Sequence, residues 1–475
     1  MEKNEMKVSE FADLDATAVA GLIESNQITP TEAFEATLGL IDTRDSQVRA
    51  VWTVLADRAL QSIRNGLPKG PFRGVPFAVK DLGLKIEGEV TTHGSSFFLG
   101  DVSQFSSELT KRYDAAGLVI CAKVSTSEFG LGPSADTDLH PRTNNPWDHS
   151  RVAGGSSTGS AAAVSSGIFS MAHASDGGGS IRIPAACCGV FGFKPSRGRI
   201  SYSPVAEPWS GMSTQHAITR TVRDSAQLLD CTAGNVPGDP YFCPPAEGTF
   251  LSASKTEPRQ LSIGVHLESA DGIHPDPEIA QRVNDMAVLL ESLGHRVSFT
   301  DLDFNLTEVA KLYGVITSTS VKMMIDERAQ KIGRQPNSDE LLSISRLIAE
   351  RGEKYRGVDL ALAREACFAA SRNISVFTEK FDAVLCPTIA TLPPKHGTYD
   401  MRSSNVEDYM SSIFKFAPYT ALASIAGQPA MNIPFGFSKD GLPIGVHFSS
   451  AFAQDALLFS LAGQLERTGL CGYKS

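Results

Sequence analysis

The stretch from Asn144 to Arg199 constrains the fold more than any other part of the chain, because Gly, Ser and Ala dominate it. Glycines cluster at 154–155 and again at 177–179, and the apolar run from Ile168 to Ala174 lies between the two clusters. A flexible linker would rarely contain such an apolar insert, whereas glycines permit tight turns. The pattern therefore predicts two tight loops that frame a buried helix and strand.

Strand and helix signals alternate on both sides of this stretch. The sequence predicts strands at Val75–Val79, Leu118–Ala122, Ala383–Cys386 and Ala430–Pro434, helices at Ser106–Ala116 and Ala456–Glu466, and a βαβ unit at Leu261–His266, Pro277–Leu293 and Arg296–Phe299. Such alternation is typical of an α/β protein. We predict a single domain over residues 1–475, with a helical N-terminal segment at 1–65. The Pro-rich excursion from Pro237 to Pro258 leaves a division into two domains open.

Charge and composition exclude several classes of function. The formal net charge is −10 without long runs of like charge, so we expect no nucleic-acid partner. No run of about 18 apolar residues occurs, and Met1–Lys7 lacks the apolar core of a secretory signal, so we expect no membrane span and a cytoplasmic location. The eight cysteines form no CxxC pair. We therefore predict buried thiols, no metal site and no cofactor.

Three features of the sequence carry chemistry. Lys80 ends an apolar strand, Gly154–Gly159 is a turn that presents hydroxyl groups, and Asp176–Ser180 places three glycines before a serine at a helix start. Backbone N–H groups converge easily at consecutive glycines, which makes an oxyanion hole, and a serine directly after them can attack the carbonyl carbon. We therefore predict Ser180 as nucleophile and Gly177, Gly178 and Gly179 as the oxyanion loop.

The serine needs a base, and the sequence offers two kinds. None of the ten histidines has a recognisable triad context, although His173 and His216 stay open. The other candidate is neutral Lys80 acting through a second serine, which requires burial to lower the lysine pKa from about 10.4. Asp81, the next residue, would oppose this if its carboxylate pointed inward, and we expect that it points elsewhere.

A second nucleophile motif overlaps the first glycine turn. Gly155-Ser156-Ser157-Thr158-Gly159 matches the G-x-S-x-G elbow of α/β-hydrolases with Ser157 at its centre, which makes a Ser-His-Asp esterase the alternative from another class. That elbow should directly follow an apolar strand. The preceding Asp148–Arg151 does not look like a strand, so we expect the match to be fortuitous.

Several motifs follow one another in a fixed order between Phe72 and Arg199. They are Gly74–Asp81, Lys123–Glu128, Asn145–Trp147, Gly154–Ser160, Asp176–Pro184, Cys188–Gly189 and Lys194–Pro195. Together they closely resemble the amidase signature family, whose pattern also requires the spacing of 24 residues between Ser156 and Ser180. Weaker similarity continues to the C-terminus. The resemblance implies the amidase-signature fold, in which helices cover both faces of a central mixed β-sheet.

The resemblance also implies an activity and a set of roles. It implies hydrolysis of a carboxamide through an acyl-enzyme on Ser180, with Ser156 as the bridging serine after a cis peptide bond and Lys80 as the ultimate base and acid. Gly130 would line the acyl side of the pocket, beside the oxyanion loop. The substrate would be a small linear, cyclic or aryl amide, and the sequence allows a homodimer.

Within the family, two groups come into question. The block from Asp176 to Ser201, with Gly238-Asp239, looks most like the bacterial hydrolases of the 6-aminohexanoate cyclic dimer. The alternative is the A subunit of glutamyl-tRNA amidotransferase, which works inside a complex and carries an acid that holds glutamine. The comparable stretch here, Ala417–Thr420, lacks that acid, which argues against the amidotransferase alternative. Nearby aromatic residues suggest an apolar or aryl-tolerant pocket instead, namely Phe414, Phe416 and Tyr419.

Overall fold

The computed structural model describes residues 8–205, 207–302, 304 and 307–473. Its centre is a sheet of 11 strands. In spatial order these are β1 (Val51–Val54), β3 (Val119–Val124), β2 (Pro76–Lys80), β6 (Met171–Asp176), β8 (Thr214–Thr219), β7 (Phe191–Lys194), β12 (Ala430–Phe437), β13 (Pro443–Ser449), β11 (Ala383–Pro387), β9 (Ser262–Val265) and β10 (Arg296–Phe299). Strands β3, β2 and β6 run parallel, as do β11, β9 and β10, and the remaining pairs are antiparallel.

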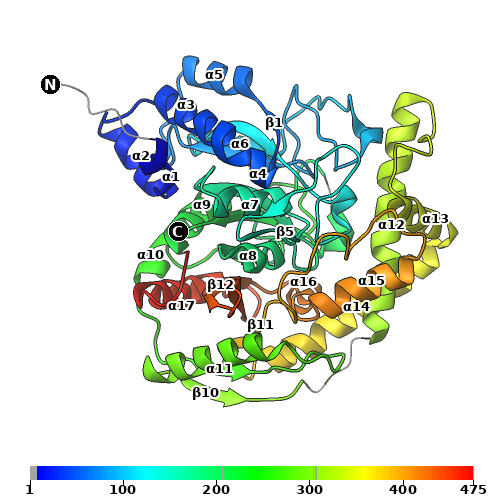
Figure 1. Cartoon of the computed structure of the whole chain (residues 1–475). Coiled ribbons are helices and arrows are strands. Elements are labelled where there is room, and N and C mark those ends of the chain that lie inside the picture. The colour runs from blue at the N-terminus through cyan, green and yellow to red at the C-terminus, as the bar shows by residue number, and fades with distance from the viewer. Residues whose placement is uncertain (1–7, 206, 303, 305–306, 474–475) are drawn as a thin grey trace.

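Helices pack on both faces of this mixed sheet (Figure 1), which confirms the predicted fold class. In chain order they are α1 (Val8–Ala12), α2 (Ala16–Glu24), α3 (Pro30–Leu40), α4 (Ser46–Val48), α5 (Ala56–Arg64), α6 (Glu108–Ala115), α7 (Thr158–Ser165), α8 (Arg182–Cys188), α9 (Val222–Thr232), α10 (Phe250–Lys255), α11 (Pro277–Ser292), α12 (Thr307–Ile332), α13 (Ser343–Lys354), α14 (Gly357–Thr378), α15 (Val406–Phe416), α16 (Ala421–Ala426) and α17 (Asp455–Arg467).

The strands and helices predicted from the sequence are present, within a few residues at their ends. The predicted βαβ unit is β9–α11–β10, and its two strands are parallel. The N-terminal segment departs from the prediction because it is not wholly helical. Strand β1 lies inside it and pairs antiparallel with β3 at the edge of the sheet.

A second departure concerns the residues before the first glycine turn. Asp148–Val152 forms strand β5, which pairs with β4 (Asn144–Asn145) in a two-stranded hairpin, so the prediction of no strand there was wrong. The hairpin was hard to foresee because polar and charged residues fill β5, and only Val152 is buried. Since β5 lies outside the central sheet, Ser157 still does not follow a central strand.

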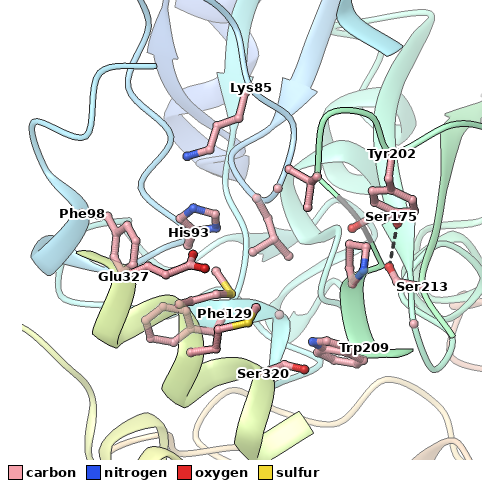
Figure 2. A pocket seen from close by; sticks show the side chains of 18 of the residues that line it. Lys85, His93, Phe98, Phe129, Ser175, Tyr202, Trp209, Ser213, Ser320 and Glu327 are labelled. Carbon is pink, nitrogen blue, oxygen red and sulfur yellow. Dashed lines mark hydrogen bonds between the residues drawn. The ribbon is translucent and has the colours of Figure 1, made fainter. Parts of the chain in front are cut away.

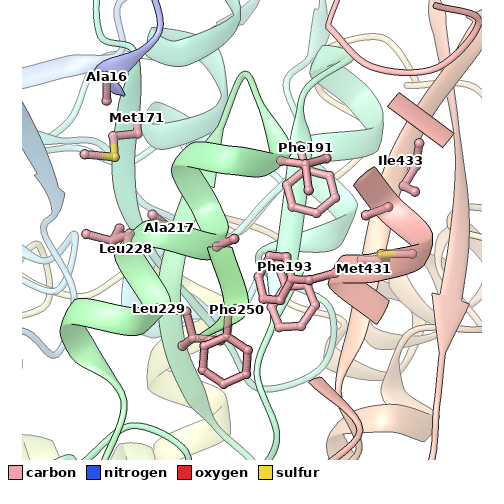
Figure 3. Close-up of a cluster of buried hydrophobic side chains, with 14 of the residues drawn as sticks. Ala16, Met171, Phe191, Phe193, Ala217, Leu228, Leu229, Phe250, Met431 and Ile433 are labelled. Carbon is pink, nitrogen blue, oxygen red and sulfur yellow. The ribbon is translucent and has the colours of Figure 1, made fainter. Parts of the chain in front are cut away.

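Alternation of side chains along β2 explains where Lys80 points. Phe77 and Val79 belong to the apolar core on one face of the sheet, whereas Ala78 belongs to the core on the other face. Because side chains alternate along a strand, Lys80 shares the face of Ala78. The first of these cores, part of which Figure 3 shows around Phe191 and Phe193, consists of apolar side chains from several strands and helices.

The glycine-rich stretch folds as two turns around a buried helix and strand, as predicted. The first turn leads into α7, a helix whose eight residues are all buried, and the chain then returns through β6 in the sheet. The second turn follows β6 directly and leads into α8, which is also fully buried. Small residues permit this close packing, and it brings both glycine turns next to the end of β2.

Candidate active site

Both glycine turns open into one cavity of about 580 Å³. Ser156, Ser180, Gly130 and Gly177 all line it, so the structure brings together residues that are far apart in the sequence. Figure 2 shows part of the lining, including Ser175 on the side of the cavity formed by β6. Lys80 does not line the cavity but lies directly behind Ser156.

The Lys80 side chain is fully buried and reaches two hydroxyl groups. Its Nζ donates to Ser156 Oγ at 2.7 Å and to Ser175 Oγ at 3.0 Å. Burial lowers the Lys80 pKa from 10.5 to about 7, although the negative charge of Asp176 partly opposes the change. A lysine with this pKa is neutral in a large share of molecules near neutral pH, as a base must be.

Asp81 points away from Lys80, as expected from the sequence. Its carboxylate accepts hydrogen bonds from the backbone N–H and the hydroxyl group of Thr92, and it forms an ion pair with Lys123 at 3.4 Å. His140 Nε2 also lies 3.4 Å from the carboxylate. These partners keep the negative charge of Asp81 away from Lys80, so Asp81 does not raise the pKa of Lys80.

The first glycine turn places Ser156 between Lys80 and the cavity. The Gly155–Ser156 peptide bond is cis, as the resemblance implied. Thr126 Oγ1 donates to the Ser156 carbonyl at 3.0 Å and fixes the turn from behind. A Cβ atom on Gly130 would lie 3.3 Å from Ser156 Oγ, so Gly130 forms the wall next to this hydroxyl.

Hydrogen bonds from several elements hold the second glycine turn. Tyr313 Oη donates to the Gly177 carbonyl at 2.8 Å, and Thr420 Oγ1 donates to the Gly178 carbonyl at 2.7 Å. The Gly179 N–H donates to Asp176 Oδ1 at 2.7 Å and is therefore already engaged. Within the part of the chain that the structure describes, the N–H groups of Gly177, Gly178 and Ser180 have no partner.

A buried ion pair anchors the start of α8 behind this turn. Arg182 Nη2 lies 2.8 Å from Asp176 Oδ1, and both side chains are fully buried. Burial alone would raise the Asp176 pKa, but the Arg182 charge and its hydrogen bonds outweigh that effect and hold it at about 2. Because Asp176 also accepts the Ile181 N–H at 3.1 Å, the ion pair fixes the backbone on both sides of Ser180.

The other candidate bases and nucleophiles lie outside the cavity lining. His173 and His216 are fully buried, and burial lowers the pKa of each to about 3. Ser157 is buried too, and its hydroxyl donates to the Ser175 carbonyl at 3.2 Å. Phe414, Phe416 and Tyr419 all lie outside the cavity lining, so the apolar pocket predicted from them is formed by other residues.

Sequence reasoning missed most of the cavity wall. Its apolar members come from distant parts of the chain. They are Leu82, Phe98, Phe105 and Phe129, then Val205, Pro208 and Trp209, and then Met323 and Met324 of α12. A Cβ atom on Gly177 would lie 2.6 Å from the Trp209 ring, so the tryptophan packs directly on the glycine turn. No local sequence pattern identifies these residues as cavity-lining, because only the tertiary fold brings them together.

The cavity holds a serine beside unpaired glycine N–H groups, and a second serine is hydrogen-bonded to a buried lysine of lowered pKa. This arrangement is typical of an acyl-transfer enzyme. Residues 32–459 match the profile of the Amidase family, and the chain belongs to this family. It is thus an amidase, a hydrolase that acts on carbon–nitrogen bonds other than peptide bonds.

Relatives and solved structures agree with this assignment. The 6-aminohexanoate-cyclic-dimer hydrolase of Paenarthrobacter ureafaciens is 32% identical over 470 residues, covering 95% of this chain and 94% of that protein. A solved structure of 6-aminohexanoate cyclic dimer hydrolase superimposes with a TM-score of 0.91 at 31% identity, covering 96% of each chain. A bacterial aryl acylamidase of the amidase signature family gives 0.86 at 25% identity, again over 96% of each.

The described residues also bear on membrane insertion and metal binding. No helix among them is both long and apolar enough to cross a membrane. Residues 8–205, 207–302, 304 and 307–473 also contain no cluster of three or more His, Cys, Asp or Glu side chains suited to a metal ion.

Proposed function

We propose that the chain hydrolyses small carboxamides through a covalent acyl-enzyme on Ser180, with Ser156 and Lys80 as its proton relay. The observation that carries the proposal is the 2.7 Å hydrogen bond between Lys80 Nζ and Ser156 Oγ, made by a lysine whose pKa lies near 7. Ser156 lines the same cavity as Ser180, so the proposed relay reaches the cavity that contains the nucleophile.

The first half of the reaction forms the acyl-enzyme. Ser180 Oγ attacks the amide carbon and gives its proton to Ser156 Oγ, which passes its own proton to neutral Lys80. The N–H groups of Gly177, Gly178 and Ser180 receive the negative oxygen, whereas the Gly179 N–H stays on Asp176. The C–N bond then breaks, and the leaving nitrogen takes a proton from Ser156, which regains one from the Lys80 ammonium.

The second half releases the acid. Water enters the cavity, loses a proton to Ser156 and Lys80 as Ser180 did, and attacks the acyl carbon. The C–O bond to Ser180 breaks, and the serine oxygen recovers its proton through the same relay. Lys80 therefore acts as base and then as acid in each half, which is efficient because its pKa lies near the working pH.

The walls of the cavity indicate the substrate class. Apolar side chains such as Phe98, Phe129 and Met324 suit an aliphatic or aryl acyl chain, and a cavity of about 580 Å³ holds a ligand of drug-like size. The similarity to 6-aminohexanoate-cyclic-dimer hydrolase supports an aliphatic amide, linear or cyclic, over glutamine. Ala417–Thr420 offers no acid to hold glutamine, which speaks against the amidotransferase alternative.

Mass spectrometry after reaction with a fluorophosphonate tests the proposal. The adduct should lie on Ser180, and Ser180→Ala should abolish both labelling and amide hydrolysis while circular dichroism stays unchanged. Ser157→Ala is the matched control, since that serine lies outside the cavity lining, and labelling of Ser180 should persist in it. An adduct on Ser157 would overturn the proposal and restore the esterase alternative.

A further inference from the structure

Helix α14 carries apolar side chains on two opposite faces. Its inner face, which includes the buried residues Ala363, Cys367 and Ile374, packs toward α12 and α16 (Figure 1). The opposite face is exposed to solvent. We call six exposed residues there the outer face of α14, namely Val358, Leu362, Glu365, Phe368, Arg372 and Val376.

The outer face is unusual for a helix at the surface, because such a helix normally presents polar residues to water. Leu362 and Val376 are 60% and 64% exposed, and Val358 and Phe368 are exposed as well. Neighbouring positions of the outer face are three or four residues apart, so all six side chains lie on one side of the helix. Single exposed apolar residues are common, whereas a continuous apolar stripe marks an interaction site.

Two opposite charges lie within this stripe. Glu365 follows Leu362 and precedes Phe368 on the outer face, and Arg372 stands between Phe368 and Val376. The two charges are seven residues apart, about two turns, whereas ion pairs within a helix join residues three or four apart. Among the residues that the structure describes, neither charge has an ion-pair partner. The outer face therefore offers one carboxylate and one guanidinium group to a partner.

The order of these charges fits a second, antiparallel copy of the same helix. Glu365 and Arg372 are equally far along α14 from the midpoint between Phe368 and Ala369. A two-fold axis at that midpoint places Glu365 opposite Arg372 of the second copy, and Arg372 opposite Glu365 of the second copy. It also brings Phe368 next to its own copy and Leu362 next to Val376 of the second copy.

We propose that the outer face of α14 is the interface of a symmetric homodimer, in which it packs antiparallel on the same face of a second copy of this chain. Helix α14 has 22 residues and is therefore about 33 Å long. One helix pair buries less surface than a large permanent interface does, so we expect a dimer that dissociates in the micromolar range. This inference is independent of the proposed hydrolysis.

Other occupants match the outer face less well. A lipid surface would take the Glu365 carboxylate out of water without a partner, and helices that lie on membranes are typically rich in Lys and Arg. The formal net charge of −10 also disfavours an anionic membrane. An unrelated protein would have to present both charges in the matching order, which a second copy does by symmetry.

Sedimentation velocity of the full-length protein from about 1 to 100 µM tests the proposal. The sedimentation coefficient should rise with concentration from that of a monomer to that of a dimer. A protein that stays monomeric throughout would refute the proposal. Binding of such a monomer to phosphatidylcholine vesicles would assign the outer face to a lipid surface instead.

A charge exchange tests the antiparallel arrangement. Glu365→Arg and Arg372→Glu should each raise the dissociation constant of the dimer roughly ten-fold or more, because like charges then face each other twice. The double variant with both substitutions should return the dissociation constant to near that of the wild type. Weak dimers in all three variants, or no effect in any, would contradict the two-fold pairing.

Glu24→Arg is the matched control, since Glu24 is an exposed residue of α2, a helix on the other side of the molecule (Figure 1). It makes the same change of charge as Glu365→Arg and should leave the dissociation constant unchanged. An equal loss of dimer in Glu24→Arg would show that net charge alone controls association, and would overturn the proposal.

Covalent crosslinking provides a second, independent measurement. Phe368 lies beside the proposed axis, so Phe368→Cys should form a disulfide-linked dimer under mild oxidation by copper phenanthroline. Val288→Cys is the control, because Val288 is equally accessible on α11 and away from the axis, and it should remain monomeric on a non-reducing gel. Absence of a crosslink in folded Phe368→Cys would count against this interface.

Discussion

Replacing Lys80 with methionine should make the protein more stable and nearly inactive. Methionine fills a similar volume without a charge, whereas the buried lysine must either lose its proton or remain charged without water. The activity should fall by about 10²- to 10⁴-fold, the usual contribution of a general base. The stability gain should depend on pH, and that dependence identifies the lysine as its source.

The size of the gain follows from the Lys80 pKa. A fall from 10.5 in the unfolded chain to about 7 in the folded protein corresponds to about 5 kcal/mol. Below pH 7 the lysine is charged in both states, so the full cost weakens the wild type. As the pH rises from 7 to 10.5 the folded state releases its proton first, and the wild type regains stability. The advantage of Lys80→Met should therefore be about 3 kcal/mol larger at pH 6 than at pH 9.

Urea unfolding at pH 6 and pH 9 measures this difference. The hydrogen bonds to Ser156 and Ser175 that methionine cannot make weaken the variant equally at both pH values, so they cancel in the comparison. Other groups that titrate in this range are present in both proteins and cancel as well. In the wild type kcat/KM should rise with pH through a limb near 7. An equal stability difference at both pH values, or no such limb, would refute a buried neutral lysine.

Three further predictions concern other parts of the molecule. Burial raises the Glu128 pKa from 4.5 to about 7, so stability is lost as the pH rises through that window, and Glu128→Gln should gain about 3 kcal/mol more in urea unfolding at pH 8 than at pH 4.5. Gly177→Ala should displace Trp209, lower the free energy of unfolding by about 1–3 kcal/mol and lower kcat/KM. Gly314→Ala is the control, because a Cβ atom there meets open space, and it should lower neither the free energy of unfolding nor kcat/KM. Activity should survive dialysis against EDTA, and a loss that added zinc restores would contradict the metal-free mechanism.

The sequence predicted those parts of the site that depend on local patterns. Lys80 could be assigned because an apolar strand leads directly to it, and the glycine turns because only glycine tolerates their close contacts. At Gly155, for example, a Cβ atom would lie 2.6 Å from the Gly132 carbonyl oxygen. The hairpin strand β5 escaped prediction because it lies off the main sheet and has no apolar face, so periodicity gave no signal.

The oxyanion loop shows a different limit of sequence reasoning. Three consecutive glycines predicted three convergent N–H groups. In the structure these N–H groups differ in their hydrogen-bond partners. The Gly179 N–H binds Asp176, because that carboxylate must satisfy donors at the start of α8 as well as Arg182. Such a division depends on a buried ion pair whose partners are six residues apart, and composition alone cannot reveal it.

The cavity wall at His93 and the proposed relay are joined through the backbone. Asp81, which follows Lys80, accepts the N–H of Thr92, and Thr92 precedes His93. Phe129, which precedes Gly130, donates its N–H to the His93 carbonyl. The backbone at His93 is therefore fixed relative to both strand β2 and the wall beside Ser156. Binding energy that a substrate gains against this part of the cavity wall can in this way be used to orient the scissile amide at Ser180, so wall contacts should affect rate as well as affinity.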